Sequence, residues 1–286
     1  MSFATSTRAA GNRVRGTVED GTHRARKPAF YFVTAAFVAF LLFALRESMV
    51  MVGTAWTGGY AFPVHRVHHM MIGGMLTVFA ATVAVQLYRP AKRVGALQAA
   101  IAFAISAFVL TAVASGLAAA GEILVFMVPV LLIALLHPAR REILPSFEGM
   151  DTRLVALAAI GALGMAAVAV GEYASHTTLT NEHVTFGHFE FMLFATVSIG
   201  LFALLGALRP TGWRALVYAA AAMAVLFAAG SLAFPGIEQG SSLGTAGALA
   251  TVAWAIAFVV LAEYVDRTDS IESESTDAEP ALTESA

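Results

Sequence analysis

The stretch PVHRVHHMMIGGMLTVFAATVAVQLYRP, residues 63–90, joins a group of histidines to a long apolar run. The run from 66 to 88 is long enough to cross the hydrocarbon core of a bilayer, which needs roughly 20 mostly apolar residues. We expect the helix to end at Arg89-Pro90, because a charged residue followed by a proline is typical of the end of a membrane helix. His65, His68 and His69 stand at its beginning. The stretch therefore predicts a membrane-spanning helix that starts among potential ligands.

The composition of the whole chain agrees with a membrane protein. Of 286 residues, 58% are hydrophobic and 13% are charged, whereas soluble domains are about 25% charged. Cysteine is absent, which excludes disulfides, iron–sulfur clusters and thiolate zinc sites. Any metal ion or haem must therefore be held by histidine, methionine, carboxylate or tyrosine side chains.

Seven other apolar runs resemble the run from 66 to 88 in length and composition. We therefore expect an all-α integral membrane protein with eight transmembrane helices. The expected spans cover residues 29–46, 66–88, 95–116, 121–137, 152–172, 185–208, 213–234 and 244–264.

The basic residues predict how the helices are oriented. If the N-terminus lies in the cytoplasm, all but two of the 17 basic side chains fall on the cytoplasmic side, as the positive-inside rule requires. We expect a multi-pass plasma-membrane protein with both termini in the cytoplasm. Six of the eight histidines then fall at the outer face: His65, His68, His69, His176, His183 and His188.

The expected domain organisation follows from the same pattern. Residues 1–28 form a basic cytoplasmic arm that suits contact with anionic lipids. A first four-helix unit covers 29–137, a cytoplasmic linker covers 138–151, and a second four-helix unit covers 152–265. Residues 266–286 form an acidic tail that we expect to be disordered. The acidic composition without cysteine favours a halophilic archaeon as the source.

Landmarks that recur at an offset of 120 residues predict an internal repeat. His68 matches His188, and Arg89-Pro90 matches Arg209-Pro210. We expect two tandem four-helix repeats of parallel orientation, because an even number of helices returns the chain to the same side. In that arrangement His68 and His188 lie at the same depth and face one another.

Several of these residues have side chains that bind metals. His65 and His69 are four residues apart and share a helix face, and His183 precedes the second unit's histidine helix. Glu190 lies between two phenylalanines, and ionisable residues inside a membrane are usually functional. Copper or zinc bound by His65, His69, His183 and Glu190 is one reading. Histidines that are simply solvated at the interface are another.

Two stretches resemble a known family. NEHVTFGHFEFMLFATVSIGLFALL, residues 181–205, resembles the tenth helix of haem–copper oxidase and nitric oxide reductase catalytic subunits, and VHRVHHMMIGGML, residues 64–76, is similar to their histidine-bearing helices. The resemblance implies haem b with His68 and His188 as axial ligands. The chain departs from the family in carrying Glu190 where a second histidine is usual, and in having eight helices rather than twelve.

Three functions remain open at this point. The first is a haem b protein for electron transfer, sensing or haem handling, with the bilayer and a redox partner at the outer face as its partners. The second is a copper- or zinc-binding membrane enzyme or metal transporter. The third is an accessory membrane protein without a cofactor. The residues define no reaction, and no nucleic-acid-binding surface is apparent.

Overall fold

The computed structural model describes residues 26–147 and 150–277, and this part of the chain is helical without strands. Eight helices are long and apolar enough to cross a membrane, which confirms the predicted number of spans. Their bounds are Arg26–Ala44, α3 (Arg66–Ala84), α4 (Val94–Ala114), α5 (Leu117–Leu136), α6 (Thr152–Thr178), α8 (His188–Ala207), α9 (Arg214–Ala233) and α10 (Gly244–Asp277).

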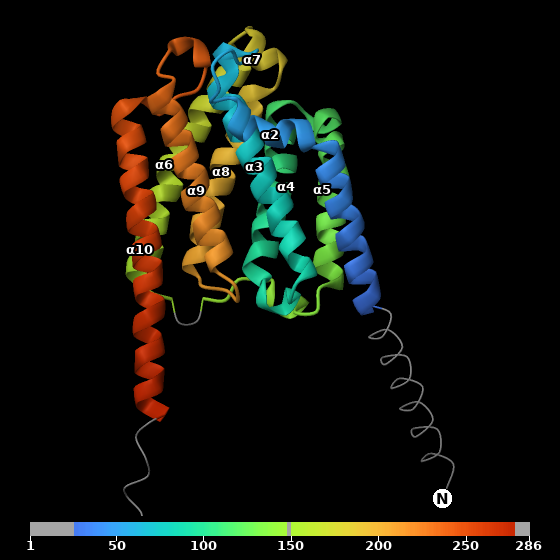
Figure 1. The fold of residues 1–286 in the computed structure, drawn as a ribbon, viewed down its shortest axis with the longest axis vertical. Coiled ribbons are helices and arrows are strands. Elements are labelled where there is room, and N and C mark those ends of the chain that lie inside the picture. The colour runs from blue at the N-terminus through green and yellow to red at the C-terminus, as the bar shows by residue number, and fades with distance from the viewer. Residues whose placement is uncertain (1–25, 148–149, 278–286) are drawn as a thin grey trace, which may run out of the picture.

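Four short elements gather at one end of the bundle, which we call the histidine end (Figure 1). They are α2 (Arg46–Thr54), η1 (Pro63–His65), α7 (Glu182–Thr185) and η5 (Ile237–Gln239). None of them was predicted from the apolar runs, because short polar helices at a membrane surface have no long hydrophobic signature. The opposite end carries the arginine-rich turns and is called the arginine end.

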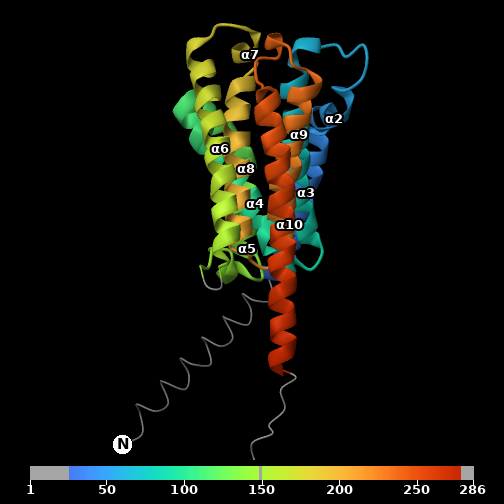
Figure 2. The ribbon, with the colours of Figure 1, turned by 90° about the vertical axis from the view of Figure 1, so that its left-hand side faces the viewer.

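The spanning helices form a central group and a peripheral group (Figures 1 and 2). Of the 18 most apolar consecutive residues of each spanning helix, between 56% and 67% are buried in the central helices α3, α4, α8 and α9, against 17–28% in the other four. Large side chains such as Phe79, Phe189 and Phe227 fill the centre. The histidine-bearing helices α3 and α8 therefore both belong to the central, more buried group.

Local backbone chemistry fixes where the chain turns. Arg89 and Arg209 both adopt the left-handed conformation, with φ of 49° and 51°, immediately before a proline that cannot continue the preceding helix. At the start of α6, the Asp151 carboxylate accepts a hydrogen bond of 3.0 Å from the backbone N–H of Leu154. This N-cap satisfies one of the free N–H groups with which α6 begins.

Two glycines permit close approach of backbone segments. A Cβ on Gly73 of α3 would lie 2.4 Å from the backbone nitrogen of Val52, so only glycine lets α2 lie against α3. At the arginine end, a Cβ on Gly95 would lie 2.8 Å from the carbonyl oxygen of Gly212. The backbone N–H of Gly95 also donates to the Thr211 carbonyl at 2.9 Å, and this contact joins the two halves of the chain.

The structure differs from the sequence prediction near the C-terminus. We expected disorder from residue 266, but α10 continues to Asp277 and projects beyond the bundle (Figure 1). Ion pairs anchor this extension: Arg214 Nε lies 2.7 Å from Glu263, and an Arg209 nitrogen lies 3.0 Å from Asp266. The remainder of the predicted tail, 278–286, and the arm up to residue 25 lie outside the described residues.

Candidate metal centre

Five histidines gather in the interior of the histidine end. His65 closes η1, His68 and His69 lie in the first turn of α3, His183 lies in α7, and His188 begins α8. Exposure of each residue is 9% or less. A buried group of imidazoles from both halves of the chain is the main polar feature of this end of the bundle.

The sequence around α7 explains how two of these histidines meet. The Asn181 side chain caps α7 by accepting a hydrogen bond of 3.2 Å from the N–H of Val184. Gly187 then adopts a left-handed conformation with φ of 68°, which glycine enters without steric cost. The chain reverses there into α8, and the turn brings His183 against His188.

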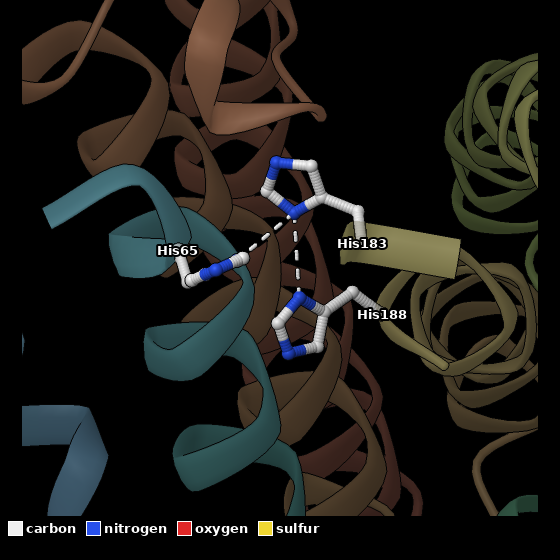
Figure 3. A group of neighbouring side chains, drawn as sticks. All are labelled: His65, His183 and His188. Carbon is white, nitrogen blue, oxygen red and sulfur yellow. Dashed lines mark hydrogen bonds between the residues drawn. The ribbon is translucent and has the colours of Figure 1, made fainter. Parts of the chain in front are cut away.

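Three of the five histidines point nitrogens at one another (Figure 3). Nδ1 of His183 lies 3.1 Å from Nδ1 of His65 and 3.3 Å from Nδ1 of His188. One nitrogen from each of the three residues lies within 4.8 Å of the others. This is the spacing of side chains that could hold a single metal ion.

The outward-facing nitrogens of two of these rings have hydrogen-bond acceptors as partners. Nε2 of His183 lies 2.9 Å from the Glu238 carbonyl oxygen, and Nε2 of His65 lies 3.2 Å from a carboxylate oxygen of Glu182. A carbonyl or a carboxylate can only accept, so each Nε2 carries the proton and donates it. In the neutral rings, the Nδ1 atoms of His65 and His183 are therefore both unprotonated, and their lone pairs face each other.

His183 is held in its neutral form. Burial lowers the pKa of His183, and the nearby His65 lowers it further, against the opposing effect of the Glu238 carbonyl. A proton shared between the facing nitrogens is therefore disfavoured at neutral pH. A cation between them would remove the repulsion of the two lone pairs.

Two of the three nitrogen separations match those of a tetrahedral metal site, and the third, between His65 and His188, is within 4.8 Å. With zinc–nitrogen bonds of about 2.0–2.1 Å, two nitrogens on one tetrahedral ion lie about 3.3 Å apart. The separations of His183 Nδ1 from His65 Nδ1 and from His188 Nδ1 are 3.1 and 3.3 Å. Imidazole suits zinc and copper in particular, so the three histidines fit either ion.

His68 and His188, predicted as haem ligands, do meet, but in the wrong orientation for haem. Their rings stack with centroids 4.9 Å apart and planes 20° apart. A bis-histidine haem needs nitrogens that point at the iron from opposite faces of an intervening porphyrin. Nε2 of His68 is also bonded to Ser241 at 2.8 Å. The two rings as arranged leave no room for haem between them.

Two of the other predicted metal ligands lie apart from the three converging nitrogens. The His69 ring stacks on His65 with centroids 5.6 Å apart, but its Nδ1 is paired with the Tyr60 hydroxyl at 2.6 Å. Glu190 contacts Ser115 and lies 3.8 Å from His176. The cluster therefore joins His65, His183 and His188, whereas Glu190 belongs to a different group of side chains.

Sequence reasoning missed the loop that closes over the cluster. Between α9 and α10, Glu238 supplies the carbonyl for His183, Gln239 donates to the Pro63 carbonyl at 2.8 Å, and Ser241 bonds His68. Glu172, at the outer part of α6, bonds Ser241 in turn. A run of glycine and serine, GIEQGSSLG at 236–244, was the available signal, because such a loop admits close contacts and supplies hydroxyl groups.

Known proteins offer no assignment for this site. No protein-family model matches the chain, and comparison with curated proteins and with solved structures likewise gives no significant match. The geometry of the side chains is therefore what defines the functional class: a multi-pass membrane protein with a buried histidine cluster.

Proposed function

We propose that the protein binds one copper or zinc ion within its histidine end, through Nδ1 of His65, His183 and His188. The observation that carries this proposal is the pair of Nδ1 lone pairs that face each other 3.1 Å apart. Outer acceptors orient both rings in the way that is typical of metal-ligating histidines, where a hydrogen bond from the other ring nitrogen fixes the tautomer.

In this proposal the metal site lies at the outer end of the membrane bundle. The positive-inside rule supports it, because the arginine end carries Arg89, Arg93, Arg140 and Arg209, whereas the histidine end carries only Arg46 and Arg66 among the described residues. A plasma-membrane protein in this orientation would take its ion from the periplasmic or extracellular medium, and the lipid bilayer is its surrounding partner.

A parallel tandem repeat accounts for how the site is assembled. Its support is the matched left-handed turn at Arg89 and Arg209, together with the stacking of His68 on His188. Related four-helix units would each contribute one histidine helix, α3 or α8, so that the ligands meet on the axis between them. The resemblance to haem–copper oxidases then concerns the histidine-bearing helices, with a metal ion in place of haem.

Metal analysis of the purified protein tests the proposal. The protein is expressed with copper or zinc, purified in detergent, and analysed for metal content and for its optical spectrum. We expect about one ion per chain, no Soret band, and loss of the ion in His183→Ala. The matched control His176→Ala alters a histidine at the same end outside the cluster and should keep the ion. A wild-type protein without copper or zinc would overturn the proposal.

A further inference from the structure

A buried chain of hydrogen bonds leads away from the cluster through residues that have no role so far. Nε2 of His68 lies 2.8 Å from the Ser241 hydroxyl, which donates to a Glu172 carboxylate oxygen at 2.8 Å. The three residues are 0%, 3% and 6% exposed. They come from α3, from the loop before α10 and from α6, so the chain links three separate segments of the fold.

The direction of these bonds fixes the tautomer of His68. A serine hydroxyl has one hydrogen, and Ser241 gives it to Glu172, so its oxygen accepts from the N–H at Nε2 of His68. Nδ1 of His68 is then a bare lone pair. It is buried, and it has no hydrogen-bond partner among the described residues. An unpaired buried polar atom is costly, so this nitrogen calls for a ligand.

The bare nitrogen belongs to a ring that already contacts the metal centre. The His68 ring lies with its centroid 4.7 Å from that of His183 and 4.9 Å from that of His188. Gly240 lies against both the His68 and the His183 ring, because a Cβ at this position would lie 2.9 Å from both His68 Cε1 and His183 Cδ2. The loop thus packs on His68 and on one of the three ligands together.

We propose that His68 is the fourth ligand of the metal, through Nδ1, and that Ser241 and Glu172 are the residues that position it. This inference rests on the proposed function. The three other nitrogens already lie within 4.8 Å of one another, and coordination by His68 requires its ring to move toward them. The Glu172 carboxylate accepts the hydrogen bond that orients the Ser241 hydroxyl toward His68.

Four imidazole ligands change what the site can do. Catalytic zinc sites keep one position open for water, whereas four protein ligands close the coordination shell. A closed site does not activate water for hydrolysis. Such a site suits a copper ion that transfers electrons by changing its oxidation state, or a metal ion that the protein senses or carries. The site would then act on electrons or on the metal ion itself.

Affinity and coordination are measured together to test this ligand set. Zinc affinity is obtained by competition with a chelator, and cobalt(II) is substituted to report coordination through its visible absorption. The variants are His68→Ala, Ser241→Ala and Glu172→Ala. Glu190→Ala is the matched control. Glu190 also contacts a serine and lies near a histidine, but it takes no part in the hydrogen bonds that join His68, Ser241 and Glu172. Circular dichroism checks that each variant keeps its helical content.

We expect His68→Ala to weaken zinc binding and to change the cobalt spectrum. Ser241→Ala and Glu172→Ala should lower the affinity about 10–100-fold, the usual effect of altering groups that orient a ligand, while Glu190→Ala leaves it unchanged. Wild-type affinity and an unchanged spectrum in both His68→Ala and Ser241→Ala would overturn this inference alone, provided that His183→Ala still abolishes binding. A wild-type protein that binds no metal would instead overturn the proposed function.

Discussion

Two groups of side chains at the histidine end contain the same three residue types. In one, Ser241 links His68 to Glu172. In the other, Ser115 contacts Glu190 and lies 3.1 Å from Nε2 of His176. Both serines follow central helices, α9 and α4 respectively. Each group also contains a histidine Nδ1 that is buried and without a hydrogen-bond partner among the described residues.

The difference between the two groups lies in their neighbours. The His68 ring packs against the rings of His183 and His188, whereas His176 has no ring contact with another imidazole in the described part of the chain. The side chains of His176 and Glu190 are also more exposed, at 13% and 18%. In our proposal a histidine, a serine and a carboxylate do not by themselves form a metal site, and the convergence of further imidazoles distinguishes the first group from the second.

The largest expected effect in this comparison comes from removing His188, one of the three converging ligands. His188 contacts the rings of His65, His68 and His69, so His188→Ala should lower metal affinity by more than about 100-fold, beyond the range of outer groups. The paired substitution, His176→Ala, should change it less than about threefold. Chelator competition measures both, and equal losses would abolish the distinction between the two groups.

The loop that closes the cluster gives the next largest effect. Gly240 and Gly244 both have positive φ, 80° and 62°, so alanine at either position costs about 1–2 kcal/mol of backbone strain. A Cβ meets the His68 and His183 rings at Gly240, but nothing within 4 Å at Gly244. Gly240→Ala should therefore weaken metal binding about tenfold, the lower end of the range for outer-group changes, whereas Gly244→Ala should affect stability alone. Equal metal affinities in the two variants would refute the packing argument.

Acid should destabilise the metal-free protein through buried histidines at both ends. Burial lowers the pKa of His183 at the histidine end and of His137 at the arginine end. In the unfolded chain both titrate near about 6.5. The unfolded state therefore binds more protons in the window below that pH, and stability falls as pH decreases through it.

Thermal unfolding in detergent between about pH 7.5 and 5.5 measures this dependence on either side of the unfolded pKa. We expect His183→Gln and His137→Gln each to reduce the loss of stability in acid, because each removes a histidine whose pKa burial lowers. A slope that neither substitution changes would show that other groups control the acid response.

The smallest effect should come from Tyr60, whose hydroxyl pairs with Nδ1 of His69 at 2.6 Å. Burial raises the pKa of Tyr60, so the phenol stays protonated at neutral pH. Tyr60→Phe removes one hydrogen bond and should cost about 1 kcal/mol of stability. Because His69 is outside the ligand set, metal affinity should stay unchanged. A large loss of affinity in Tyr60→Phe would bring His69 into the ligand set.

The spans and the histidine end were predictable because hydropathy and charge are properties of contiguous sequence. The directions in which the side chains point were less predictable. Glu190 is two residues after His188, which is about 200° around a helix, so a glutamate adjacent in sequence faces away from the cluster. The partnership of Ser241 and Glu172 with His68 depends on how α6 and the loop before α10 meet α3, and no local pattern encodes that contact.

The central claim is that imidazole nitrogens from both halves of the chain hold one metal ion. X-ray absorption spectroscopy of the zinc- or copper-loaded protein tests it most directly. The account predicts a first shell of nitrogens, at about 2.0–2.1 Å for zinc, with the outer-shell scattering of imidazole rings, four rings in the wild type and three in His68→Ala. A first shell of oxygen atoms without imidazole scattering would contradict it.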